Sequence, residues 1–191
     1  MLGAMPCLAG CQGALPMLDY CSTLGAPEGL IVATSPYILT VREKIGHDLL
    51  LLPSVCVLVI GSDGRLLLVR NADTGEWQTI GGSVEPDEPP RDAAVREALE
   101  EAGVEVQLVG LVDVIGGPQF RLVYPNGDLT SYVSIVFEAA VSGGEPRPDG
   151  DETTEVAWWS LADLEQLPVA AFSRALLSWP SLALRLREVP R

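Results

Sequence analysis

The chain has 191 residues, of which 48% are hydrophobic, and its 12 basic and 26 acidic residues give a formal charge of −14. This length accommodates one domain with an added arm, and the apolar content is sufficient for a core. So acidic a chain is poorly suited to nucleic-acid backbones or anionic membranes, which bind to positive surfaces. We therefore expect no nucleic acid polymer and no membrane as partner, and an anionic substrate only in company with a cation.

Residues 1–34 differ from the rest because they are rich in Gly, Ala, Leu, Met and Pro and lack sustained periodicity. We expect an N-terminal arm over 1–34 and a domain over 35–191. The arm is open to three interpretations: a packed segment, a partner-binding tail, or an overextended start with Met5 or Met17 as the initiator. No apolar run is long enough for a membrane span and no basic stretch precedes one, which predicts a cytoplasmic protein. Three of the four cysteines lie in the arm and Cys56 in an apolar run, which favours free thiols.

Apolar runs predict strands between the arm and residue 80. The segment 37–44 fits either a short helix or a strand. Pro53 separates two continuous apolar runs, and Ser62, Asp63 and Gly64 supply a turn. We expect buried strands over 49–52 and 55–60 and a hairpin return over 65–70.

A helix is predicted from Pro90, which suits a first turn, to the residue before Gly103, which suits a C-terminal stop. Glu97, Glu100 and Glu101 are spaced i, i+3 and i+4 and share one side of this helix. Their mutual repulsion would be relieved by a hard divalent cation, Mg²⁺ or Mn²⁺, and the alternative is a solvated acidic face. The apolar side should consist of Ala94, Val95, Ala98, Leu99 and Ala102.

Strands should follow over 104–114, with a break near Gly110, and over 119–124 and 129–140, joined by the hairpin signal Pro-Asn-Gly-Asp. A loop over 142–151, a strand over 155–159, a short helix over 161–167 and a helical tail over 169–186, interrupted at Pro180, complete the chain. Trp158 and Trp159 should face opposite sides of their strand. The expected core includes Leu108, Leu111, Val133, Ile135 and Phe137.

The spacing of charged residues around the helix resembles the Nudix box. Five residues separate Gly82 from Glu88, seven more lead to Arg96 and Glu97, and the pattern ends Ala-Leu-Glu-Glu-Ala-Gly-Val at Val104, so every fixed position is filled. The resemblance implies an α/β protein with the Nudix fold, an α/β/α sandwich with a mixed β-sheet, over 35–191. Ile80 stands where many relatives have proline and Asp87 where glycine is frequent, which puts loop shape in more doubt than chemistry.

The resemblance also implies a metal-dependent hydrolase that cleaves a phosphoanhydride bond in a nucleoside diphosphate linked to another group, with Mg²⁺ or Mn²⁺ as cofactor. Matched to the box, Glu97, Glu100 and Glu101 would bind metal and the Gly81 carbonyl would complete the shell. Arg96 would orient Glu97, with Glu88 as its structural partner. The expected catalytic set is Glu97, Glu101, Arg96 and Glu152.

Glu152 is included because relatives add a late-loop carboxylate as a further metal ligand or general base. Glu155 is the less favoured choice, and a solvated acidic loop is the alternative for both. Glycines and prolines over 142–155 predict a mobile flap that closes over the phosphates.

The substrate itself is left open between a nucleotide sugar or ADP-ribose type and a (d)NTP. Trp77, Phe120 and Tyr132 are candidate substrate-binding residues that would stack on a base, although most aromatic residues in strands are core. The rival class is a non-catalytic Nudix-like module that binds a nucleotide or a protein. A remote alternative, isopentenyl diphosphate isomerisation, would need Cys56 as catalytic cysteine. A homodimer is also compatible with the sequence.

Overall fold

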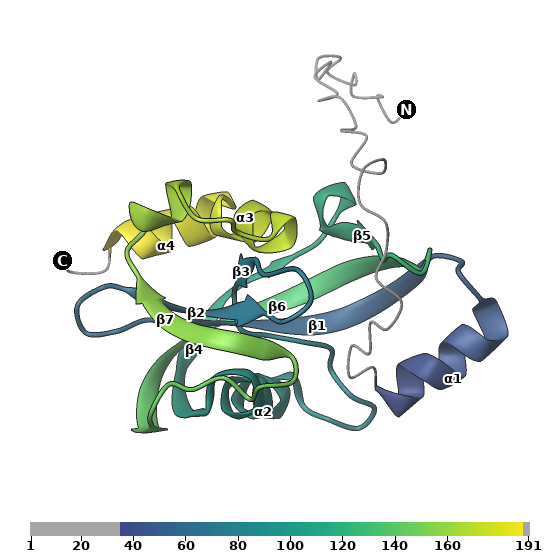
Figure 1. Cartoon of the computed structure of the whole chain (residues 1–191), viewed down its shortest axis with the longest axis horizontal. Helices are drawn as coiled ribbons and strands as arrows, with labels where there is room; N and C mark the ends of the chain where they lie inside the picture. The colour runs from purple at the N-terminus through teal and green to yellow at the C-terminus, as the bar shows by residue number, and fades with distance from the viewer. Residues whose placement is uncertain (1–34, 189–191) are drawn as a thin grey trace, which may run out of the picture.

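The computed structural model describes residues 35–188, so the predicted arm over 1–34 lies outside the described part of the chain. Strands form the middle layer, with α2 on one side and α3 and α4 on the other (Figure 1). This is the α/β/α arrangement that the resemblance implied. The elements are α1 (Pro36–Ile45), β1 (Leu50–Val59), β2 (Leu66–Asn71), β3 (Trp77–Gln78), α2 (Pro90–Ala102), β4 (Val104–Ile115), the 3-10 helix η1 (Pro118–Phe120), β5 (Arg121–Val123), β6 (Leu129–Gly144), β7 (Thr153–Trp159), the 3-10 helix η2 (Asp163–Glu165), α3 (Ala171–Leu177) and α4 (Pro180–Glu188).

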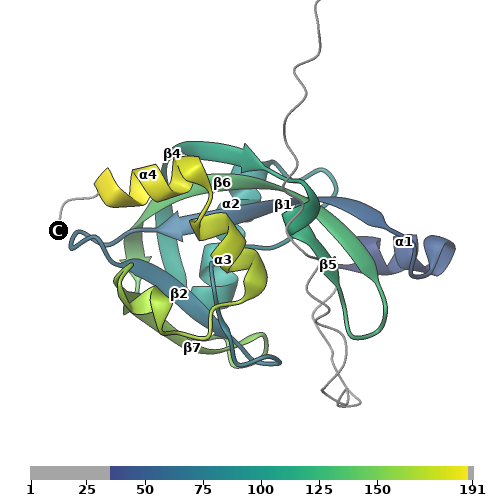
Figure 2. The ribbon, with the colours of Figure 1, turned by 90° about the horizontal axis from the view of Figure 1, so that it is seen from above.

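The strands form two sheets that lie edge to edge. In the first, β1 pairs with β6 in parallel, β4 pairs with β6 in antiparallel fashion, and the short β5 extends along β6. The second is antiparallel, in the order β3, β2, β7. Isolated bridges from Val57 to Ile80 and from Ile60 to Leu66 join the two sheets. The predicted mixed sheet is therefore confirmed, and Figure 2 shows α3 and α4 lying across it.

Alternation along the strands creates two hydrophobic clusters, one on each face of the strand layer. Val57 belongs to the cluster beneath α2, whereas its neighbour Leu58 belongs to the cluster beneath α3 and α4. Trp158 packs against the first cluster and Trp159 against the second. The prediction that these two tryptophans face opposite sides is thus confirmed.

Helix α2 begins at Pro90 and ends at Ala102, where it is capped by Gly103 with the left-handed φ of 66° that favours glycine. Its buried stripe differs from the predicted one. Val95 and Leu99 are exposed, whereas the carboxylate-bearing Glu97 and Glu101 are buried. The helix contacts the strands through Ala94, Ala98 and Ala102, spaced four residues apart, and the glutamates that precede two of these alanines, Glu97 and Glu101, are buried along the same side.

Proline does not interrupt the first strand, because β1 runs through Pro53. Val55 and Val57 donate their N–H groups to Gly82 and Ile80, on the side away from β6. Pro53 shares this orientation, so its missing N–H removes no bond to β6. The segment 37–44 is helical, within α1.

Four further expectations need correction. The hairpin over 55–70 is a single bridge at a turn, because β1 and β2 belong to different sheets. Near Gly110 the strand β4 shifts register by a bulge without breaking. The helix expected over 161–167 is only the 3-10 turn η2, and β6 continues to Gly144, into the expected loop.

The predicted core is correct only in part. Phe137 is buried, and Leu108 and Ile135 pack against the same cluster, but Leu111 and Val133 are exposed. The reason is that α2 covers only part of the sheet face to which these side chains belong. In the described part of the chain, no helix is both long and apolar enough to cross a membrane.

Candidate active site

Two glycines allow the loop before α2 to pass closely between β1 and the helix. Gly81 has φ of 150°, and a Cβ there would lie 2.2 Å from the carbonyl oxygen of Val55. A Cβ on Gly82 would lie 2.3 Å from Oε1 of Glu97. The carbonyls of Ile80 and Gly82 both accept from β1, so by alternation the Gly81 carbonyl lies on the other edge, where its own N–H reaches Glu101.

Arg96 connects the acidic residues of this loop and helix. Its Nε and Nη2 donate to the two carboxylate oxygens of Glu88, at 2.8 and 3.0 Å. Its Nη1 donates to Glu97 and to Glu100, each at 2.8 Å, and Nη2 reaches the carbonyl of Ser83 at 3.2 Å. The hydrogen bonds from Arg96 lower the pKa of Glu88. Glu88 therefore lies where the sequence placed it, as the partner of Arg96.

Among residues 35–188, Glu97 and Glu101 are the two buried carboxylates, with 8% and 4% of their surface exposed. Burial raises the pKa of Glu97 to about 7; Arg96 opposes this effect, whereas Glu100 and Glu152 add to it. Burial also raises the pKa of Glu101 well above its usual range, although the N–H of Gly81 donates to its Oε2 at 2.9 Å. The negative charge of these two carboxylates is thus not fully compensated by positive groups.

Glu152 is the late-loop residue that faces the helix carboxylates. Burial is the main cause that raises the pKa of Glu152, and repulsion from Asp149 and Glu100 raises it further. Glu152 in turn raises the pKa of both Glu97 and Glu101. Glu155 instead forms an exposed ion pair with Arg70, at 2.5 Å. Of the two candidates, Glu152 is therefore the one whose charge interacts with the helix carboxylates.

The loop that carries Glu152 is fastened to the end of α2. The hydroxyl of Thr153 donates to the carbonyl of Glu101 at 2.8 Å, and the N–H of Arg147 donates to the carbonyl of Ala102 at 2.9 Å. Asp149 accepts from the N–H groups of Glu152 and Thr153, at 3.1 and 2.8 Å. The wide flap movement expected from the sequence is therefore not needed to bring Glu152 to the site.

The donor set fits a hard divalent cation, because the carboxylates of α2 and the late loop and the Gly81 carbonyl supply only oxygen. A ready-made cage is absent: among residues 35–188, no three Asp, Glu, His or Cys side chains are grouped as ion ligands. One reason is that Glu100 is exposed and bonded to Arg96. Glu97 and Glu101 are both buried, and Arg96 pairs with Glu97 but not with Glu101, so a cation is nevertheless favoured at this position.

Two of the expected substrate-stacking residues are core residues. Trp77 is buried and packs edge-on against Trp159, with ring centroids 5.2 Å apart. Phe120 is fully buried against Phe172, at 5.3 Å. Tyr132 is partly buried and its hydroxyl lies 2.6 Å from that of Tyr124. A strand pattern identifies such rings as half-buried but does not say which side a helix covers.

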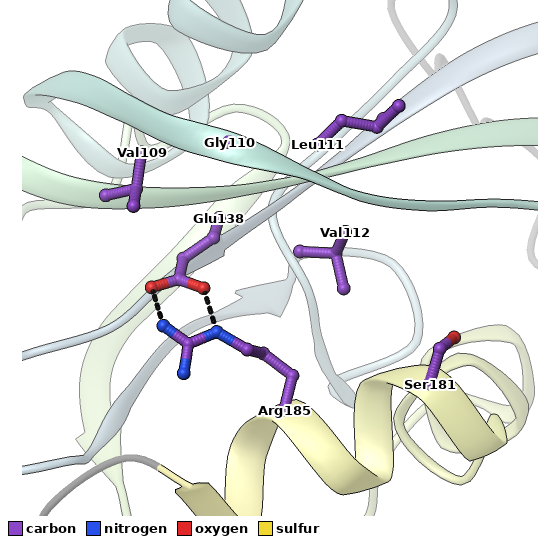
Figure 3. Close-up of a pocket in the computed structure, with 7 residues that line it drawn as sticks. All are labelled: Val109, Gly110, Leu111, Val112, Glu138, Ser181 and Arg185. Carbon is purple, nitrogen blue, oxygen red and sulfur yellow. Dashed lines mark hydrogen bonds and ion pairs between the residues drawn. The ribbon is translucent and has the colours of Figure 1, made fainter.

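A separate hollow of about 410 Å³ lies between β4 and α4 (Figure 3). Arg185 crosses it to Glu138 in a two-bond ion pair, at 2.6 and 2.7 Å. None of the predicted site residues lines it. The lining residues are Val109, Gly110, Leu111, Val112, Glu138, Ser181 and Arg185.

A family model described as NUDIX domain matches residues 50–180. A MutT-like protein of Streptomyces ambofaciens is 36% identical over 124 residues, which cover 65% of this chain and 73% of that protein. The NAD-capped RNA hydrolase NudC of Pseudomonas putida is 35% identical over 118 residues, which cover 61% of this chain but only 39% of NudC. Among solved structures, an ADP-ribose pyrophosphatase of Streptococcus suis shares 25% identity and a TM-score of 0.55, over 71% of this chain and 90% of that one.

Proposed function

The chain belongs to the Nudix family of pyrophosphohydrolases, and we propose that it is metal dependent and cleaves a phosphoanhydride bond in a nucleoside diphosphate linked to another group. The observation that carries the proposal is the burial of two carboxylates one helical turn apart, Glu97 and Glu101, of which Glu97 alone pairs with Arg96. Such an arrangement destabilises a ligand-free fold and is relieved by a bound cation. A helix face with a purely structural role would not need two buried carboxylates.

The cation, Mg²⁺ or Mn²⁺, would be held by Glu97, Glu100, Glu101, Glu152 and the Gly81 carbonyl. When bound, it would supply charge neutralisation for the phosphates and polarise the attacking water. The protein residues have separate tasks. Arg96 holds the Glu97 carboxylate in place through its Nη1.

Glu152 would act as general base, taking the proton of the attacking water on a carboxylate oxygen. Its raised pKa makes it a stronger base than an ordinary glutamate, which suits that task near neutral pH. The Glu152 N–H donates to Asp149 and the Thr153 hydroxyl donates to the Glu101 carbonyl, and these bonds hold the loop so that the base is positioned before substrate arrives. The catalytic set proposed is therefore Glu97, Glu101, Arg96 and Glu152.

The substrate is proposed to be a small molecule of the ADP-ribose, nucleotide sugar or (d)NTP type. The Streptococcus structure is named for ADP-ribose, and NudC is named for NAD-capped RNA. This chain spans less than half of the length of NudC. A formal charge of −14 disfavours an RNA chain as ligand. Tyr132 remains an aromatic candidate for contact with a base, and Tyr124, whose hydroxyl lies beside that of Tyr132, is a further one.

Isoprenoid isomerisation is disfavoured by the state of Cys56. Its thiol is buried, and burial raises its pKa to about 12, against the opposing effect of a hydrogen bond with Thr79. A thiol in that state is not available as a nucleophile or proton donor to a ligand.

The test is a panel of ADP-ribose, nucleotide sugars, dinucleoside polyphosphates and oxidised dNTPs, assayed with Mg²⁺ or Mn²⁺ for release of phosphate, pyrophosphate or nucleoside monophosphate. Glu101→Gln should keep the fold and lower kcat by roughly 100-fold or more. Glu105→Gln, an exposed glutamate on β4, is the matched control and should retain activity. Release of none of these products from any compound would favour the non-catalytic binding module, and an active Glu101→Gln enzyme would end the assignment of that residue.

A further inference from the structure

Exposed apolar side chains gather on the part of the first sheet that α2 leaves uncovered. In the pairing register, Val133 lies beside Pro53, Val114 beside Ile135, and Leu111 beside Phe137. Paired residues share a face, and Ile135 and Phe137 belong to the cluster beneath α2. We call this surface the open sheet face; its exposed residues are Leu51, Pro53, Leu111, Val114 and Val133.

The open sheet face and the hollow beside α4 share Leu111, but the Leu111 side chain belongs to the open sheet face. Figure 3 shows Leu111 pointing away from α4, whereas Val109 points toward the hollow. Leu51 lies at the far end of the face, on β1, and 64% of its surface is exposed. A contiguous apolar surface that crosses three strands is typical of a surface that another segment covers.

The described chain begins at the rim of this face. The hydroxyl of Ser35 donates to Glu85 Oε2 at 2.7 Å, and the next residue back along that loop, Val84, donates its N–H to the carbonyl of Pro53 at 3.2 Å. Ser35 also accepts from the N–H of Tyr37 and so fixes the start of α1. Ser35, the first described residue, is therefore held by the loop that contacts Pro53.

The composition of residues 1–34 suits an apolar surface. They contain no Lys or Arg and only two acidic residues, Asp19 and Glu28, and they end in the run Leu30, Ile31 and Val32. The domain itself is strongly acidic, so a second copy would bring like charge to the face, whereas this segment would not.

The distance is also within reach. Three neighbouring strands span about 10 Å, and ten extended residues about 33 Å, so the fifteen residues before Ser35 suffice to cross the face. We propose that residues 20–34 dock on the open sheet face of their own chain, with the run from Leu30 to Val32 against Leu51 and Val133. Docking would cover apolar surface that α2 leaves in contact with water.

Thermolysin cleavage of the full chain tests the proposal, because this protease cuts before residues such as Leu, Ile and Val. The double variant Leu51→Ser/Val133→Ser removes apolar contact from the face without adding charge. The matched control is Val109→Ser, whose side chain is 62% exposed but faces the hollow. Mass spectrometry then follows cleavage between residues 28 and 34, and the melting temperature checks that all three proteins are folded.

Cleavage in this window should be roughly fivefold or more faster in the double variant than in the wild type, and unchanged in Val109→Ser, because proteolysis follows the population of the open form. The wild-type chain should be monomeric by light scattering, with a cleavage rate independent of protein concentration. Equal rates in all three proteins would overturn the proposal. A wild-type dimer that the double variant converts to monomer would also overturn it, because the face would then bind a second copy.

Discussion

Gly82 offers a sharp test of how the glycine loop fits the helix carboxylate. A Cβ at this position would lie 2.3 Å from Oε1 and 2.6 Å from Cδ of Glu97, whereas ordinary contact begins at 3.4 Å. The loop backbone is held by the hydrogen bond from Val55 to the Gly82 carbonyl, so the flexible end of Glu97 must move. In Gly82→Ala the carboxylate is therefore displaced by about 1 Å from its position beside Arg96.

A displacement of about 1 Å at a catalytic group lowers a rate by on the order of 100-fold. We expect kcat/KM of Gly82→Ala to fall by about that factor on the substrate identified from the panel, with either metal. Stability should change little, because Gly82 is not among the glycines with positive φ and alanine is compatible with its backbone. Steady-state kinetics and a thermal melt separate the two effects.

Gly110→Ala is the control, because no atom lies within 4 Å of a Cβ at that position in β4. Its activity and melting temperature should match the wild type. If Gly82→Ala retains wild-type kcat/KM while folded, then the position of Glu97 seen here does not matter to the reaction, and the reasoning from this contact is refuted.

Three further measurements address other parts of the molecule. Arg96→Lys should lower kcat/KM by roughly tenfold while the protein stays folded, because lysine cannot make the two-bond contact with Glu88 and also reach the helix carboxylates; kinetics that match the wild type would contradict this. Cys56 should stay unlabelled by iodoacetamide at pH 8 until denaturant is added, as peptide mapping would show, because burial raises its pKa to about 12. Asp128→Asn should destabilise the protein by less than about 1 kcal/mol near pH 5 to 6. Hydrogen bonding from His47 lowers the pKa of Asp128, so the difference in stability between variant and wild type should disappear as pH falls through that lowered pKa. Chemical denaturation at several pH values measures this difference, and a difference that persists at pH 2 would contradict the prediction.

The sequence predicts how the box residues are placed relative to one another, because the helix itself sets their spacing. Pro90 and Gly103 bound α2 as expected, and the one-turn separation of Glu97 and Glu101 places both on the same stripe. Arg96 contacts Glu88 across the loop, as the box spacing indicated. These are local relations over less than twenty residues.

The sequence does not predict which apolar face a distant element covers. Leu111 and Phe137 are paired neighbours on one face, yet one is exposed and the other buried, because α2 reaches only the second. Trp77 and Phe120 look like stacking residues in a strand pattern, but α3 and α4 pack over their cluster. Val95 is likewise exposed because the alanines of α2, and not its largest side chains, set how the helix lies.

The bond from Thr153 to the carbonyl of Glu101 has a consequence for how the protein folds. It joins residues 52 positions apart. The parallel pairing of β1 with β6 likewise places Leu50 beside Thr130. Both contacts require closure of long loops, which is slow relative to helix formation. The box sequence can form its helix early, but Glu152 reaches that helix only after β6 and β7 are in place. Catalytic competence should therefore be acquired in the final, slowest phase of refolding, after most of the helical signal has returned.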